Sequence, residues 1–184
     1  YNRIVNSKDL NDREFAFVRS LALIGLARTK ISIGQIRKDP KKIDLGIMFI
    51  TSALTGLGTI RDEDPKSFNL LKWDERNAFY TAQVSRADAY LSLFAISKER
   101  DAKPDMKLLE TAANMIQPVI NDGSLVPMEM TQIEARLVLA DSYASGTDIQ
   151  NIRKALIIYN EAITTILKET PTSSYTRSKR KAMA

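Results

Sequence analysis

The chain of 184 residues contains neither cysteine nor histidine. Without cysteine it can form no disulfide, hold no metal through thiolates and use no thiol nucleophile. Without histidine it lacks the commonest general base, the commonest transition-metal ligand and the side chain that titrates near neutral pH. Most hydrolase mechanisms therefore lose their usual base, and we expect neither a cofactor nor a metal site.

Glycine and proline are also scarce, at 7 and 6 residues, while hydrophobic residues make up 44% of the chain. This composition is typical of a folded globular protein rather than of a disordered or fibrous one. No apolar run approaches the roughly 18–20 residues that a membrane-spanning helix needs. The richest run, at 21–27, is followed directly by Arg28. We therefore expect no transmembrane segment.

The chain begins with Tyr1 and shows no basic, then apolar, leader. We expect either a mature product whose leader has been removed or a piece excised from a longer chain. The sequence leaves the compartment open: a periplasmic or envelope-associated location and a cytoplasmic one are equally compatible with it.

The net charge of +5 lies mostly at the C-terminal end, where Arg177, Lys179, Arg180 and Lys181 stand without any acidic residue among them. The rest of the chain is nearly neutral. A basic run of this kind can contact phosphates or acidic lipids. Its basic residues do not alternate with aromatic ones that could stack on bases, so we expect a solvated tail and no nucleic-acid partner.

Apolar residues recur at three- and four-residue spacing through six segments, which predicts six helices. Turn-forming residues divide them into three antiparallel hairpins at about 12–57, 74–120 and 127–169. The sequence therefore predicts a single all-α domain over 1–184. Residues 173–184 are expected to begin a seventh, capping helix, and Pro127 and Pro171 to lie at helix boundaries.

Several details of these helices are specific enough to test. Gly56 and Gly58 are expected to end the second helix near Leu57, and Pro118 to disturb the last turn of the fourth. Two outer helices are expected to bury broad apolar faces. The first face comprises Phe15, Val18, Leu21, Ala22, Ile24, Leu26, Ala27 and Ile31, and the second comprises Ile152, Ala155, Leu156, Tyr159, Ala162 and Ile166.

The third hairpin carries a specific pattern of small and large residues. Its first helix contains Leu139, Ala140 and Tyr143, and its second contains Ala155, Tyr159 and Ala162. Small residues allow two helix axes to approach, and an aromatic residue fills the groove beside them. This pattern resembles the tetratricopeptide repeat.

The resemblance weakens towards the N-terminus. The second hairpin repeats part of the pattern with Ala87 and Tyr90, and the first hairpin matches only by analogy, with Ile24 and Gly25. The hairpins are spaced by about 62 and 53 residues, whereas the family repeats every 34. The resemblance implies a stack of about three hairpins in a right-handed superhelix, made irregular by the longer loops.

In the tetratricopeptide family, the first helices of the hairpins line a concave groove. The resemblance implies that Asp88 and Asp141 occupy offsets where carboxylate-binding members have asparagine, so this groove is not expected to hold a carboxylate. We expect it to face a basic or polar segment of a protein partner, although solvated carboxylates are the alternative. The groove offsets correspond to Arg19, Ala22, Leu26, Lys30, Thr81, Val84, Asp88, Leu91, Glu134, Leu137, Asp141 and Ser145.

The sequence thus predicts a non-enzymatic scaffold or adaptor that binds a protein or peptide. Assembly with other copies or chains and a place in an envelope-associated complex are both compatible with this prediction. The alternative is a helical regulatory or substrate-binding domain of a larger enzyme, and an enzyme that relies on carboxylates alone ranks third. Fold analogy does not choose among these classes, because many functions share one scaffold.

Overall fold

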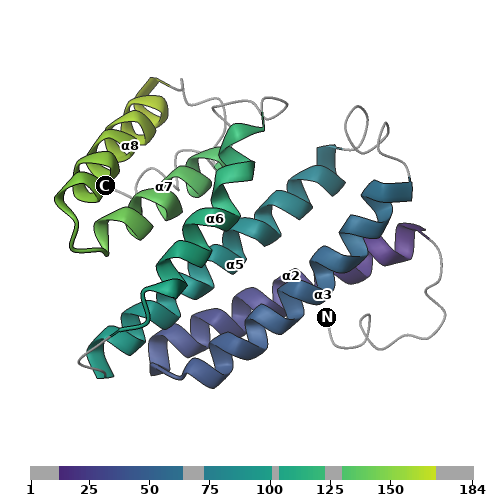
Figure 1. Cartoon of the computed structure of the whole chain (residues 1–184). Coiled ribbons are helices and arrows are strands. Elements are labelled where there is room, and N and C mark those ends of the chain that lie inside the picture. The colour runs from purple at the N-terminus through teal and green to yellow at the C-terminus, as the bar shows by residue number, and fades with distance from the viewer. Residues whose placement is uncertain (1–12, 64–72, 101–103, 123–129, 169–184) are drawn as a thin grey trace.

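A computed structural model describes residues 13–63, 73–100, 104–122 and 130–168 of the chain. Within these ranges all regular structure is helical, which confirms the all-α prediction (Figure 1). Six helices are formed there: α2 (Arg13–Arg37), α3 (Pro40–Glu63), α5 (Trp73–Arg100), α6 (Lys107–Asn121), α7 (Met130–Ala144) and α8 (Ile149–Lys168).

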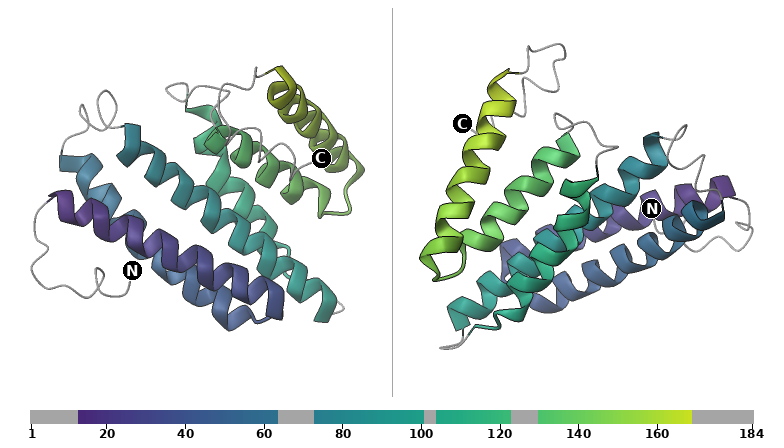
Figure 2. Two further views of the ribbon diagram at one scale, coloured as in Figure 1. Left: turned by 180° about the vertical axis from the view of Figure 1, so that it is seen from behind. Right: turned by 45° about the horizontal axis from the view of Figure 1, so that its top comes forward.

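The helices pack as sequential pairs, α2 with α3, α5 with α6 and α7 with α8. Each pair also packs against the next through α3 with α5 and α6 with α7. The first helices of the pairs touch as well, α5 contacting both α2 and α7. Figure 2 shows the α2/α3 pair and α8 at opposite edges of this arrangement, which is consistent with stacked hairpins.

The tight turn between α2 and α3 follows from the residues at its centre. Lys38 adopts a left-handed backbone conformation with φ of 50°, and the Asp39 amide donates a hydrogen bond to the Gly34 carbonyl at 2.8 Å. The Asp39 carboxylate accepts a hydrogen bond from the Lys41 amide at 3.0 Å. Asp39 therefore caps α3. Pro40 suits the first position of the helix, because an amide N–H there would have no acceptor within the helix.

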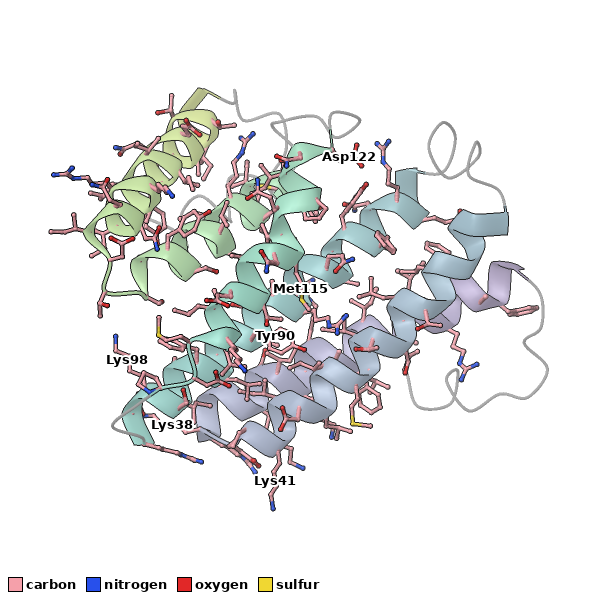
Figure 3. All side chains as sticks on the ribbon, in the orientation of Figure 1. Lys38, Lys41, Tyr90, Lys98, Met115 and Asp122 are labelled. Atoms are coloured by element: carbon pink, nitrogen blue, oxygen red, sulfur yellow. The ribbon has the colours of Figure 1, made fainter. Side chains whose placement is uncertain are left out.

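The C-terminal end of α5 is tied to this turn. Arg100 donates a hydrogen bond to the Lys38 carbonyl at 2.6 Å, and the Lys38 ammonium pairs with Glu99. Figure 3 shows Lys38, Lys41 and Lys98 at this end of the molecule, while Asp122 lies at the other end of the α5/α6 pair. There Asp122 accepts a hydrogen bond from the Tyr80 hydroxyl, which ties the end of α6 to the start of α5.

Two apolar clusters hold the pairs together. In the first, Ile43, Ile50 and Leu57 lie seven residues apart on one face of α3 and are fully buried against α2 and α5. The second cluster joins α5, α6 and α7, with Ile116 at its centre and fully buried. The helix α5 belongs to both clusters and is therefore the middle element of the stack.

The helix axes of α2 and α3 come close together where glycines face the partner helix. A Cβ atom on Gly46 would lie 2.6 Å from Cγ1 of Ile31 and 3.0 Å from the carbonyl oxygen of Ala27. A Cβ atom on Gly34 would lie 2.5 Å from Cγ1 of Ile43. Larger side chains would force the two helices apart.

The small residues of the third pair are buried as the repeat pattern requires. Ala140, Ala155 and Ala162 are at most 1% exposed, and Leu139 is buried with them. Tyr143 packs on the second apolar cluster, and its ring lies 5.7 Å from the Lys154 ammonium. This pair therefore makes its contact through alanines, with aromatic residues at the edge.

One predicted helix end was wrong. The helix α3 does not end near Leu57 but continues past Gly56 and Gly58 to Glu63. Each glycine costs a helix only about 1 kcal/mol, which burial of Leu57 outweighs. Pro118 lies inside α6, three residues before its end, and the helix continues through it because proline there removes a single backbone hydrogen bond.

The expected apolar faces of the two outer helices are only partly buried. Phe15, Val18 and Leu21 on α2 are 41–47% exposed, and on α8 Ile152 and Leu156 are 38% and 58% exposed. The prediction that these five residues are buried was wrong. Each of the two helices packs mainly on one side, and the described helices leave the other side uncovered.

Some expectations lie outside the described residues. These are the capping helix at 173–184, the basic tail with Arg177, Lys179, Arg180 and Lys181, and the roles of Pro127 and Pro171 at helix boundaries.

Candidate functional site

A pocket of about 270 Å³ lies where the first helices of the three pairs meet. Its side chains recur at three- and four-residue spacing on α2, α5 and α7, so each helix turns a single face towards it. The wall consists of Arg28, Ile31, Ser32 and Gln35 from α2, Val84, Ser85 and Asp88 from α5, and Glu134, Leu137 and Val138 from α7.

Four of the predicted groove residues line this pocket, namely Val84, Asp88, Glu134 and Leu137. They come from two hairpins that are separated in the sequence, and α5 contacts α7 directly. Asp141 lies one turn beyond Leu137 on α7 and close enough to Asp88 to act on its charge. The structure thus brings together the acidic residues that the sequence places in one groove.

The other predicted residues do not line the pocket. Arg19 and Lys30 lie on α2 but outside its pocket-lining row, and Thr81 lies one turn before Ser85 on α5. Leu91 packs against the apolar cluster between α5, α6 and α7. Ser145 follows α7, and its amide donates a hydrogen bond to the Asp141 carbonyl.

Of the two remaining groove offsets on α2, Ala22 is buried and Leu26 is half-buried. Neither of them lines the pocket.

Sequence reasoning missed the contribution of α2. The pocket uses the row Arg28, Ile31, Ser32 and Gln35, whereas the predicted offsets followed a different row of the same helix. The first hairpin has the weakest repeat pattern, so the offsets carried over to it had no firm register. The polar residues Arg28, Ser32 and Gln35, which recur at three- and four-residue spacing on α2, are the signal that could have identified this face.

Two side chains of α2 reach across to the neighbouring helices. The Gln35 amide donates hydrogen bonds to Oδ2 of Asp88 at 3.3 Å and to Oγ of Ser92 at 2.7 Å. The guanidinium of Arg28 lies 4.0 Å from the Glu134 carboxylate. The side chain of Arg28 is 53% exposed, so this ion pair is screened by water and adds at most about 1 kcal/mol to stability.

Asp88 has an unusual electrostatic environment. Burial raises its pKa above 3.8, the value for an unperturbed aspartate, and the nearby carboxylates of Asp141 and Glu134 raise it further. The hydrogen bond from Gln35 and the charge of Arg28 act in the opposite direction without cancelling this effect. The nearby positive charge therefore does not fully compensate the ionised Asp88 carboxylate for its burial and for the neighbouring negative charges.

Asp141 is held from the other side by α8. The Tyr159 hydroxyl donates a hydrogen bond to its Oδ1 atom. Burial and this hydrogen bond raise the pKa of Tyr159, so its hydroxyl remains a donor at neutral pH. Tyr159 belongs to the repeat pattern, and it connects the packing of the third pair to the acidic residue beside the pocket.

Comparisons with protein-family models, with curated proteins and with solved structures found no match to this chain. Of the helices that the structure describes, none is both long enough and apolar enough to cross a membrane.

Proposed function

We propose that this protein is a tetratricopeptide-like repeat module that binds a protein or peptide partner along the face formed by α2, α5 and α7. In this proposal the three helix pairs form a right-handed superhelix with these first helices on its concave side. The protein acts as a scaffold or adaptor rather than as an enzyme.

One observation supports this proposal most strongly. The pocket is built jointly by the first helices of all three pairs and combines apolar with acidic side chains. Mixed grooves of this kind suit an extended or helical peptide, whose apolar side chains contribute affinity and whose charges contribute specificity. Val84, Leu137 and Val138 supply the apolar contacts, and Asp88, Glu134 and Asp141 favour a basic or polar segment.

The test begins with a peptide selected for binding to the full chain from a random displayed library. Its affinity is then measured for the unaltered protein and for the double variant Asp88→Lys with Asp141→Lys, which reverses the charge of the groove. We expect binding to weaken at least tenfold, because like charges would now meet a basic peptide.

The matched control is the double variant Asp44→Lys with Glu110→Lys. It makes the same change of charge at exposed positions on α3 and α6, outside the pocket. Circular dichroism checks that both variants are folded. The proposed function would be contradicted if the groove variant and the control bound the peptide equally well. It would also be contradicted if no library peptide bound the unaltered protein better than it bound the groove variant.

A further inference from the structure

The pocket between α2, α5 and α7 is small for a ligand site. Its volume of about 270 Å³ lies just below the ~300–1,000 Å³ that is usual for sites binding whole small molecules. It is open to the groove that we propose as the partner surface. A single side chain projecting from a bound peptide fits these dimensions better than a cofactor does.

The pocket wall is divided between apolar and polar residues. Ile31, Val84, Leu137 and Val138 offer an apolar surface, whereas Ser85, Asp88 and Glu134 supply polar atoms. Lysine and arginine match such a division, because their aliphatic stems cover apolar surface while their heads stay charged. An uncharged apolar side chain would add no positive charge beside the Asp88 carboxylate.

The charges around the pocket favour a cation. Asp88 and Glu134 line it and Asp141 acts on Asp88 from beside it, whereas Arg28 is the cation that faces them. The guanidinium of Arg28 is paired with the Glu134 carboxylate at the long distance of 4.0 Å, and its side chain is half-exposed. A second positive charge would therefore lower the electrostatic cost of the ionised Asp88 carboxylate.

Ser85 gives an independent indication that the pocket suits a polar ligand. It is only 7% exposed, and its hydroxyl has no hydrogen-bond partner. Elsewhere on the helices, Ser20, Ser92 and Ser142 bond to the backbone carbonyl four residues earlier, but Ser85 does not. A buried hydroxyl without a partner costs stability, so its presence in the wall of the pocket points to a ligand that supplies one.

The hydrogen bond from Gln35 distinguishes between the two basic side chains. Gln35 donates to Oδ2 of Asp88, so one of the two acceptor positions of that oxygen is already used. A guanidinium binds a carboxylate best through both oxygens at once, whereas an ammonium needs only one. The compact ammonium of lysine therefore suits this carboxylate better.

We propose that the pocket binds one lysine side chain of the protein partner, with Asp88 as the counter-ion of its ammonium, Ser85 as a second polar contact and its stem against Val84 and Leu137. This inference rests on the proposed function, since the lysine arrives as part of a peptide bound in the groove.

The test uses the strongest selected peptides and replaces each lysine in turn by norleucine, which keeps the stem and removes the charge. Affinities are measured by calorimetry for the unaltered protein and for Asp88→Asn. We expect one lysine whose replacement weakens binding to the unaltered protein at least tenfold, which corresponds to about 1.4 kcal/mol. For Asp88→Asn, the same replacement should weaken binding by less than about threefold, because the counter-ion is gone.

Three results would overturn the inference in different ways. Tolerance of norleucine at every position, together with loss of binding by the groove double variant, would remove the lysine and leave the proposed function intact. If norleucine weakened binding equally for the unaltered protein and for Asp88→Asn, the lysine would bind somewhere other than beside Asp88. An arginine peptide binding at least tenfold more tightly than its lysine counterpart would overturn the assignment of an ammonium.

Discussion

The close approach of α2 and α3 predicts opposite effects for the same substitution at two positions on α3. Gly46→Ala places a methyl group 3.0 Å from the carbonyl oxygen of Ala27 and 2.6 Å from Cγ1 of Ile31. The side chain of Ile31 is buried and β-branched, so it has little freedom to rotate. The carbonyl belongs to the backbone of α2 and can move only with the helix. Gly58→Ala meets nothing within 4 Å.

The magnitudes follow from two opposing effects. Replacing glycine by alanine within a helix stabilises it by roughly 0.5–1 kcal/mol, and this gain is shared by both variants. Overpacking at a tight contact costs about 1–3 kcal/mol, and this cost applies only to Gly46. We therefore expect Gly58→Ala to be more stable than the unaltered protein and Gly46→Ala to be less stable.

The difference between the two variants isolates the steric effect, at about 1–3 kcal/mol. For a chain of this length, 1 kcal/mol shifts Tm by roughly 2–4 °C. Denaturant unfolding followed by far-ultraviolet circular dichroism measures both free energies of unfolding. If Gly46→Ala were as stable as Gly58→Ala, the two helices would not approach as closely as described, and the packing of the first pair would have to be revised.

Three further predictions concern the core, the third pair and the pocket. Ile116→Ala should lower the free energy of unfolding by about 2–5 kcal/mol, because Ile116 is fully buried between α5, α6 and α7, and a loss below 1 kcal/mol in denaturant unfolding would contradict that burial. Ala162→Leu should cost about 1–3 kcal/mol by overpacking against α7, whereas the control Ile163→Leu, which is 51% exposed, should change stability by less than about 0.5 kcal/mol in the same assay. Asp88→Asn should raise Tm at neutral pH. The pKa of Asp88 is raised in the folded state, so the unaltered protein loses stability as pH rises through that pKa. The higher Tm of the variant should therefore shrink towards that of the unaltered protein as pH falls towards 3.8, and a constant difference in Tm at every pH would contradict this cause.

The sequence was most informative where a pattern repeats within a helix pair. The alanines of the third pair predicted its packing, because a small residue at a helix crossing can be read directly from the spacing of large and small side chains. The C-terminal end of α3 was less predictable, since burial of Leu57 outweighs the helix-breaking tendency of the two glycines that flank it.

The pocket could be predicted only in part. Asp88 and Glu134 were identified through the repeat offsets of the second and third pairs, where the pattern is clear. The contribution of Arg28 and Gln35 was missed, because it depends on how α2 is rotated against α5, and this rotation is set by tertiary contacts. The unsatisfied hydroxyl of Ser85 likewise depends on neighbours from other helices.

The most direct test of the proposed binding face is to map a selected peptide onto the folded chain by amide chemical shifts. We predict that the largest changes cluster at residues 28–35 of α2, 84–88 of α5 and 134–138 of α7, and that they disappear with the Asp88→Lys and Asp141→Lys double variant. Changes centred on α3, α6 or the outer side of α8 would contradict this prediction.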